Sequence, residues 1–171
     1  MFQYLFVILL FIFLGTALYG GVKGAPWVPT RKEDISRFLK LANIKPEDVV
    51  YDLGSGDGSL VMAAAKRGAR AFGFEISLFP YLISKIKQLI IGLPNLSIRY
   101  KDFFSQDLSL ADLVYVFLMP KCYRRLKEKL ETQLKPGARV ITYVWPVPGW
   151  RPVKVDKPTP RSITLYLYQM A

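Results

Sequence analysis

The sequence predicts an α/β protein with a three-layer, mostly parallel sheet, an antiparallel C-terminal hairpin and one preceding transmembrane helix. Three observations support this fold class. Residues 2–22 are apolar, helix-like and strand-like segments alternate after residue 30, and a glycine-rich loop follows the first strand. Such alternation is typical of parallel sheets covered by helices. We expect an anchor at 1–22, a linker at 23–29 and one folded domain at 30–171.

The N-terminal segment predicts a membrane anchor. Residues 2–22 carry no charge, and as a helix they span about 31 Å, the thickness of a bilayer core. The first charges, at Lys23, Arg31 and Lys32, follow this segment. Positive charge on this flank places the body in the cytoplasm. A cleaved signal peptide is the alternative, because small residues stand near the end of the segment, but a basic region before it is lacking.

Charge and rare residues exclude several classes of site. The formal charge of +11 is spread over the body rather than gathered in one run, so we expect no nucleic-acid partner. Solvated helix faces or attraction to an anionic membrane account for such a charge. The chain has no histidine, which excludes a histidine base and histidine metal ligands. We predict no metal site, and Cys122 alone cannot form an intramolecular disulfide.

Hydrophobic periodicity divides the domain into helices and strands. The motif Thr30-Arg-Lys-Glu33 predicts a capping box at the start of a helix that ends before Pro46. Further helices are expected at 60–66, 78–91 and 121–134. Strands are expected at 48–53, 70–75, 96–100, 112–118 and 138–145, followed by a hairpin of 153–156 and 162–168.

A glycine-rich loop contains the predicted ligand site. The strand ending at Leu53 is followed by glycines at 54, 56 and 58. Glycine lets the backbone turn tightly beside a ligand, and the next helix directs free N–H groups there. A nicotinamide dinucleotide and S-adenosylmethionine are the two candidates. The dinucleotide fingerprint needs glycine where Ser59 stands, whereas Asp52-x-Gly-x-Gly-x-Gly58 resembles the first motif of class I S-adenosylmethionine-dependent methyltransferases.

This resemblance implies which residues hold the cofactor. Glu75 ends the second strand, where an acid accepts hydrogen bonds from ribose hydroxyls. Asp102 follows the third strand, where methyltransferases of this class usually direct an acid to the adenine amino group, and Phe103 would pack on the ring. A turn role for Asp102 remains the alternative. The expected cofactor-binding residues are Thr30, Asp52, Gly54, Ser55, Gly56, Gly58, Glu75, Asp102 and Phe103.

Further motifs resemble one small family over roughly residues 25–170. This family includes an archaeal broad-specificity protein-lysine methyltransferase and the mitochondrial lysine methyltransferases of the adenine nucleotide translocase and the ATP synthase c-subunit. Membership implies a Rossmann-like methyltransferase fold and a membrane or membrane-associated protein substrate. The motifs are Val28-Pro-Thr30, Val50-Tyr-Asp-Leu-Gly-Ser-Gly-Asp-Gly58, Asp102-Phe-Phe104, Leu134-Lys-Pro-Gly-Ala-Arg-Val140, Gly149-Trp150 and Thr164-Leu-Tyr-Leu-Tyr168.

The same resemblance places the methyl acceptor beside the segment from Val116 to Pro120, which includes Leu118, and beside the loop after the fifth strand. Tyr143, Trp145 and Trp150 could form aromatic walls, since an apolar pocket lowers the pKa of a lysine, but packing within the core or loops is the alternative for each of them. We identify no general base. Relatives tend to carry acidic residues where this chain has Val144-Trp-Pro146, and neither valine nor proline can hold an ammonium group.

The predicted function is therefore a membrane-anchored, S-adenosylmethionine-dependent methyltransferase that acts on a protein lysine. Two alternatives stay open. In the first, the methyl acceptor is a lipid or another small amphiphile. In the second, the domain is a non-catalytic module that binds S-adenosylmethionine.

Overall fold

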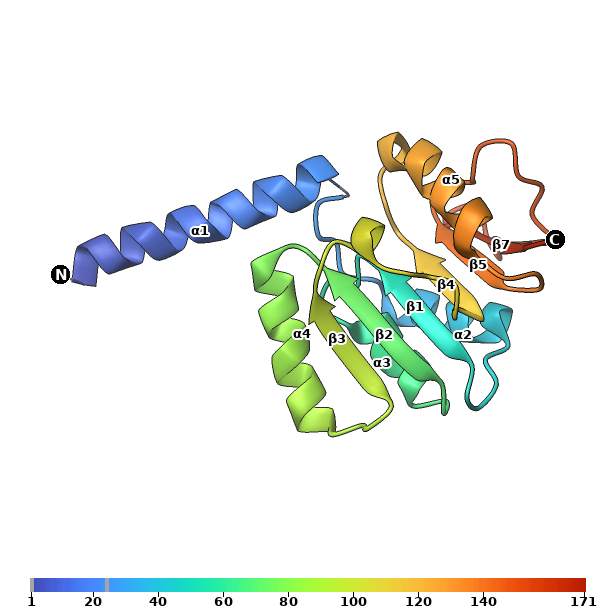
Figure 1. The fold of residues 1–171 in the computed structure, drawn as a ribbon, viewed down its shortest axis with the longest axis horizontal. Coiled ribbons are helices and arrows are strands. Elements are labelled where there is room, and N and C mark those ends of the chain that lie inside the picture. Colours follow the sequence, from blue (N-terminus) through green and yellow to red (C-terminus); the bar gives the residue numbers. More distant parts are fainter. Residues whose placement is uncertain (1, 24) are drawn as a thin grey trace.

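The computed structural model describes residues 2–23 and 25–171, with five helices and a seven-stranded sheet in these ranges (Figure 1). The helices are α1 (Phe2–Lys23), α2 (Lys32–Ala42), α3 (Ser59–Ala65), α4 (Leu78–Ile91) and α5 (Tyr123–Gln133), with single 3-10 turns η1 (Phe103–Ser105) and η2 (Pro120–Cys122). The strands are β1 (Val49–Leu53), β2 (Arg70–Glu75), β3 (Leu96–Tyr100), β4 (Leu113–Val116), β5 (Arg139–Tyr143), β6 (Lys154–Asp156) and β7 (Leu165–Gln169).

The sheet has the predicted architecture. Its strand order is β3-β2-β1-β4-β5-β7-β6; β1 to β5 are parallel, and β7 pairs antiparallel with both β5 and β6. The fold class is confirmed as a three-layer, Rossmann-like sheet with an antiparallel end. From β1 the chain adds strands towards one edge of the sheet, and from β4 it adds them towards the other. Open α/β sheets form a crevice for ligands at such a change in strand order.

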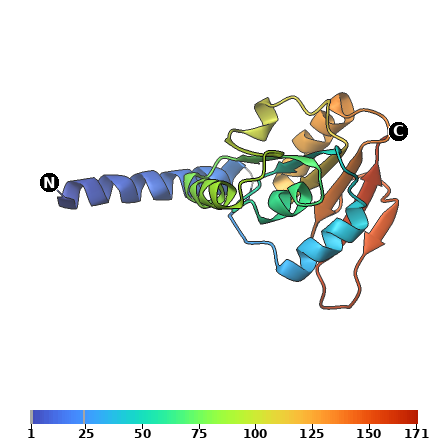
Figure 2. The ribbon, with the colours of Figure 1, turned by 90° about the horizontal axis from the view of Figure 1, so that it is seen from below.

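Two apolar cores lie on opposite faces of the sheet. On one face Val50 packs with Phe38 of α2 and Val61 of α3, and on the other Leu53 packs with Leu126 of α5. Neighbouring strand residues point to opposite faces, so each central strand is buried on both sides, as parallel strands generally are. Figure 2 shows the helices on both sides of the sheet.

Most predicted elements are present, and their differences in length have local causes. The bounds of β2, α4 and β3 are as predicted. The predicted capping box is wrong, because α2 begins after Arg31 and no side chain caps it. β5 ends two residues early, since Val144 takes a φ of 73° and leaves the sheet. The helix predicted at 121–134 begins at Tyr123, because Pro120 starts a 3-10 turn.

Helix α1 projects from the body beside the start of α4 (Figures 1 and 2). Its segment Gln3–Gly21 is long and apolar enough to cross a membrane. The ring of Phe13 meets Phe79 edge-on at 5.1 Å, and a Cβ on Gly20 would lie only 2.0 Å from Ser77 Oγ. Lys121 Nζ donates to the Gly21 carbonyl at 2.8 Å. The C-terminal half of α1 is thus tied to the carboxyl edge of the sheet.

Arg37 joins α2 to the far end of the sheet. Its guanidinium donates to Asp34 Oδ1 at 2.7 Å and to Asp156 Oδ2 at 2.7 Å. The other oxygen of Asp34 accepts from the Tyr143 hydroxyl at 2.6 Å, and the Asp34 side chain is buried. Removing one partner of a buried ion pair leaves the other charge without compensation.

We expect Arg37→Ala to lower the free energy of unfolding by about 3–5 kcal/mol, because it leaves the buried Asp34 carboxylate without its charged partner. The measurement is denaturant unfolding in detergent micelles, followed by circular dichroism. Arg124→Ala is the matched control: its pair with Glu128 is exposed, and we expect a loss below about 1 kcal/mol. Equal losses in the two variants would contradict the role of Arg37.

Candidate active site

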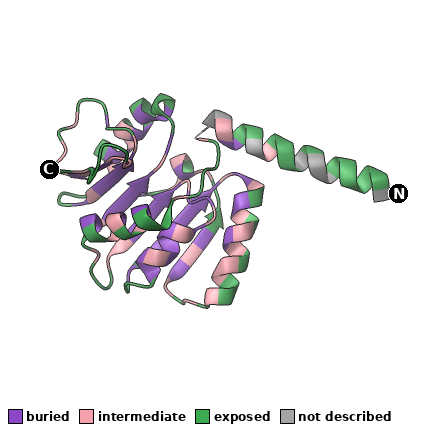
Figure 3. Ribbon diagram, turned by 180° about the vertical axis from the view of Figure 1, so that it is seen from behind, coloured by how far each residue is buried: buried purple, intermediate pink, exposed green. Residues whose placement is uncertain are grey.

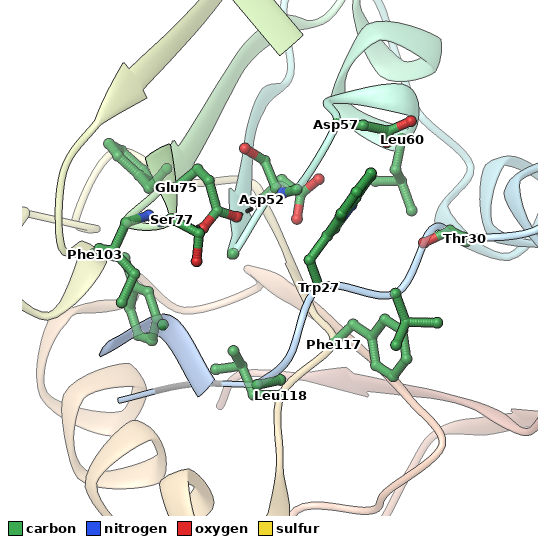
Figure 4. A pocket seen from close by; sticks show the side chains of 18 of the residues that line it. Trp27, Thr30, Asp52, Asp57, Leu60, Glu75, Ser77, Phe103, Phe117 and Leu118 are labelled. Carbon is green, nitrogen blue, oxygen red and sulfur yellow. Dashed lines mark hydrogen bonds between the residues drawn. The ribbon is translucent and has the colours of Figure 1, made fainter. Parts of the chain in front are cut away.

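A cavity opens at the carboxyl edge of the sheet, beside the switch between β1 and β4 (Figure 4). The loop after β1, the end of β2, the residue Phe103 and the end of β4 form its walls. The linker residues from Ala25 to Val28 and the C-terminal part of α1, through Gly20, also border it. Segments far apart in the sequence therefore meet at one place.

Glu75 fixes the glycine loop in position. Its Oε2 accepts from the Gly56 N–H at 2.8 Å, while Oε1 accepts from the N–H groups of Ile76 at 2.9 Å and Ser77 at 2.7 Å. The loop glycines at 54, 56 and 58 all have positive φ, a conformation that glycine adopts without steric cost. Each carboxylate oxygen has more than one acceptor site, so Glu75 can still accept from a ligand.

Three acidic side chains, those of Asp52, Asp57 and Glu75, line the cavity. Asp52 is 2% exposed, and its pKa is raised well above the usual value by burial and by the nearby Glu75 and Asp57 carboxylates. Burial also acts to raise the pKa of Asp57, but hydrogen bonds from Lys87 and Ser59 outweigh it and hold that pKa below its usual value. Lys87 Nζ lies 2.5 Å from Asp57 Oδ2. Among the described residues, Lys87 pairs with Asp57 and no ion pair involves Asp52, which lines the cavity.

Two buried hydroxyl groups in the wall are unsatisfied. Ser55 Oγ and the Tyr115 hydroxyl have no hydrogen-bond partner among the described residues. Burial, and then the charge of Asp52, raise the pKa of Tyr115 well above its usual value, so the phenol is protonated at neutral pH. The Ser55 hydroxyl packs against β2, since a Cβ on Gly73 would lie 2.7 Å from Ser55 Oγ. The Tyr115 hydroxyl lies beside Thr30, whose side chain acts to lower its pKa, and both of these residues line the cavity.

Trp27 of the linker reaches into the cavity (Figure 4). A Cβ built on Gly56 would lie 2.8 Å from Trp27 Cδ1, so the indole packs directly against the glycine loop. The indole also meets Phe79 edge-on, with ring centroids 5.8 Å apart. The linker thus covers the loop and couples it to α4.

The structure gathers most of the residues expected to bind the cofactor. Those that line the cavity are Thr30, Asp52, Gly54, Ser55, Gly56, Glu75 and Phe103. Gly58 stands at the start of α3, behind the loop. The carboxylate of Asp102 accepts from the Phe104 N–H at 2.8 Å, which is a turn contact directly beside Phe103.

The residues expected around the acceptor are more dispersed. Leu118 lines the cavity, whereas Pro120 begins η2. The Tyr143 hydroxyl is bonded to Asp34, and Trp150 Nε1 donates to Glu131 at 2.7 Å. Trp145 is exposed after β5. Tyr143 and Trp150 therefore make contacts within the fold, outside the described cavity wall.

One cavity residue on β4, Tyr115, was missed by sequence reasoning, whereas Phe117 falls within the segment 116–120 that was expected to border the acceptor. Tyr115 and Phe117 both line the cavity, and Phe117 meets Tyr143 edge-on at 4.5 Å. Their spacing of two on a strand was the available signal, because alternate residues share a face. Tyr143 thus supports Phe117 from behind.

A switch-point cavity with a glycine loop and an acid at the end of β2 defines a class I, S-adenosylmethionine-dependent methyltransferase. An RNA methyltransferase from Salinibacter ruber, solved with S-adenosyl-L-homocysteine, superposes with a TM-score of 0.78 at 33% identity, covering 84% of this chain and 94% of that one. The family model for the ANTKMT methyltransferase domain matches residues 52–154. The chain belongs to this family.

Three relatives show how the family is represented. A protein-lysine N-methyltransferase of Saccharolobus islandicus is 37% identical over 86% of this chain and 94% of its own length. The Xenopus laevis lysine N-methyltransferase of the ATP synthase c-subunit is 33% identical over 74% of this chain. An adenine nucleotide translocase lysine N-methyltransferase of Mus musculus is 35% identical over 76%. The chain matches 56% and 57% of these two vertebrate proteins.

The cavity fits S-adenosylmethionine chemically. The cofactor carries an ammonium and a sulfonium, which suit the acidic side chains around Asp52, and ribose hydroxyls, which suit Glu75. When bound, it supplies a methyl group already activated on sulfur. The protein's own tasks are to orient the reactants and exclude water.

We expect Asp52→Asn to stabilise the cofactor-free protein and to weaken cofactor binding. Because the pKa of Asp52 is raised on folding, the folded state holds this proton more tightly. The carboxylate therefore lowers stability as pH rises from its unfolded pKa of about 3.9 towards its folded value, and above that the cost is complete. Removing the charge removes this cost near neutral pH.

The measurements are thermal unfolding and calorimetric titration with S-adenosylhomocysteine near neutral pH. A charge-assisted hydrogen bond contributes about 1.5–3 kcal/mol, so affinity should fall roughly 10- to 100-fold in the Asn variant. An unchanged dissociation constant would contradict the role of Asp52.

We expect Gly56→Ala to abolish measurable binding of S-adenosylhomocysteine, because φ is positive there and a Cβ would enter the space against Trp27. Gly137→Ala separates the two causes. Gly137 also has positive φ, but a Cβ there meets nothing within 4 Å. That variant should lose about 1 kcal/mol of stability and bind normally. Equal binding losses would show that general destabilisation, rather than the space lost beside Trp27, is responsible.

Proposed function

We propose that this methyltransferase modifies a lysine of a protein that lies in or on a membrane. The observation that carries the proposal is that Gly20 borders the cavity, although it belongs to the apolar span Gln3–Gly21. Donor and acceptor would therefore meet at the membrane surface. Identity of 37% to a protein-lysine N-methyltransferase supports lysine as the acceptor.

We propose the following roles for the cavity residues. Asp52 holds the cofactor ammonium, Glu75 the ribose, and Phe103 packs on the adenine, with Asp102 beside it. Thr30 and the loop residues Gly54, Ser55, Gly56 and Gly58 complete the cradle. The lysine enters along Phe117 and Leu118, which line the cavity next to the Tyr115 hydroxyl.

The chemistry needs an unprotonated lysine in line with the methyl group. An apolar approach past Phe117 and Leu118 lowers the pKa of the entering ammonium group. The Tyr115 oxygen, which lacks a partner among the described residues, accepts a hydrogen bond from the free amine and orients its lone pair. With the cofactor bound, these residues would align the amine nitrogen so that an N–C bond could form as the cofactor supplies its methyl group and keeps the electron pair of the broken bond, and the methylated ammonium would then lose a proton to water.

The division of the chain follows from the same proposal. Residues 1–22 anchor the protein as a single pass, residues 23–29 link, and residues 30–171 form the catalytic domain on the cytoplasmic side. Lys121, which is bonded to the end of α1, adds to the positive charge of Arg31 and Lys32 on that flank. Such a bias favours a cytoplasmic position.

An RNA acceptor is the second candidate. The Salinibacter ruber structure is described as an RNA methyltransferase, and this chain carries a charge of +11. Against it, Phe117 and Leu118 offer no side-chain acceptor for the amino group of a base. A lysine side chain, with its apolar stem, suits these residues better.

Transfer of label from radioactive S-adenosylmethionine to host membranes tests the proposal. We expect protease-sensitive label that is recovered as methyl-lysine after hydrolysis, and a large loss with Asp52→Asn. Solvent-extractable label would indicate a lipid acceptor, and nuclease-sensitive label would indicate RNA. No transfer with normal S-adenosylhomocysteine binding would indicate a non-catalytic module.

A further inference from the structure

One face of α4 is apolar and largely exposed, although its first residue, Phe79, meets Phe13 and Trp27. The five side chains of this face are spaced so that they share one side of the helix, and their exposed fraction rises from 43% at the first to 79% at the last. These residues, named here the α4 stripe, are Phe79, Leu82, Ile86, Leu89 and Ile90. Soluble monomers rarely expose a long apolar patch without a partner.

The surroundings of the α4 stripe are basic and aromatic. The 24 residues from Leu78 to Lys101 contain four basic and no acidic side chains. The exposed Tyr100 of the edge strand β3 packs against Tyr81 of α4, with ring centroids 5.2 Å apart. An apolar helix face with lysines and tyrosines beside it is typical of a helix that lies in the membrane interface.

The position of α1 indicates where that membrane lies. Phe13 of α1 touches Phe79, the first residue of the α4 stripe. Phe13 is eight residues before Gly21, hence about 12 Å along the helix. If α1 spans a bilayer up to Gly21, the start of α4 stands at the level of the lipid. Amphipathic helices are buried to about 5–10 Å, so the contact between Phe13 and Phe79 lies just below the usual depth and the rest of the α4 stripe lies near it.

The directions of the two helices agree with this position. α4 runs steeply across α1, as the two views in Figures 1 and 2 show. An α1 along the bilayer normal therefore sets α4 along the bilayer plane. Figure 3 shows exposed residues along the outer side of α4, the side towards which α1 projects.

We propose that the α4 stripe is a lipid-docking surface, seated in the boundary between headgroups and acyl chains of the bilayer that α1 spans. The proposal rests on the membrane anchoring proposed above. Docking at two elements, rather than one, fixes the orientation of the domain. The cavity is then held at the height of the surface, with its opening facing lysines close to the lipid.

Collision accessibility of nitroxide labels tests the surface in the full-length protein. The protein is reconstituted in vesicles of phosphatidylcholine and phosphatidylserine in equal amounts, with single labels at Ile86→Cys and Leu89→Cys. Cys122 is buried, so the introduced thiol is the accessible one. Phe11→Cys on α1 reports the anchor, and Glu128→Cys on the exposed side of α5 reports water.

We expect the ratio of oxygen to nickel-complex accessibility at 86 and 89 to be about tenfold above that at 128, as for the interface of a bilayer. An accessibility ratio typical of lipid at residue 11, together with ratios typical of water at residues 86 and 89, would overturn the proposed docking surface and leave the proposed anchor intact. An aqueous value at 11 would overturn the anchor. Shielding from both probes at 86 and 89 that disappears on dilution would indicate a second copy and overturn the proposal.

Charge introduced into the stripe gives a functional readout. Ile86→Glu and Leu89→Glu should lower methyl transfer to vesicle-embedded acceptors about tenfold, because a charge in the interface opposes docking. Binding of S-adenosylhomocysteine should not change. Leu110→Glu is the matched control, as Leu110 is 66% exposed and precedes β4 at the amino edge of the sheet, opposite the cavity. Transfer equal to wild type in the α4 variants would overturn the proposal.

Discussion

The active cavity depends on the carboxylate of Glu75, which joins the ends of β1 and β2 through the Gly56 N–H. Three backbone N–H groups converge on this one side chain. Hydrogen bonds to a charged group are stronger than neutral ones, so the loop keeps its positive φ angles without a ligand. Glu75, which we propose as the ribose-binding residue, also holds the glycine loop in place. Its loss would therefore remove the ribose contact and the loop conformation together.

The sequence predicted the parts of the molecule that local pattern determines. The bounds of β2, α4 and β3 follow from clear hydrophobic runs ended by turn residues, and Asp52 and Glu75 follow from strand ends beside glycines. The Thr30 capping box failed because the linker draws Thr30 to the cavity instead. Val144 at φ 73° has no local signal, since β-branched residues rarely adopt that conformation.

The aromatic residues show why the acceptor side was harder to predict. Composition alone does not tell a pocket wall from a packing contact, and the indole of Trp150 and the phenol of Tyr143 have their polar ends bonded to Glu131 and Asp34. The phenol of Tyr115 has no such partner among the described residues. An unsatisfied polar end in a cavity is a tertiary property, which depends on strands that pair only after folding.

An acceptor loop without an acid is easier to understand if the membrane contributes to selection. Val144-Trp145-Pro146 offers no carboxylate to attract a lysine ammonium, so affinity for the side chain alone would be low. Restriction of enzyme and acceptor to one surface raises their effective concentration without any new contact. With α1 and the α4 stripe both in lipid, orientation would supply specificity that this loop does not provide by charge. An acid introduced at Val144 or Pro146 should then relax the need for a membrane rather than create the activity.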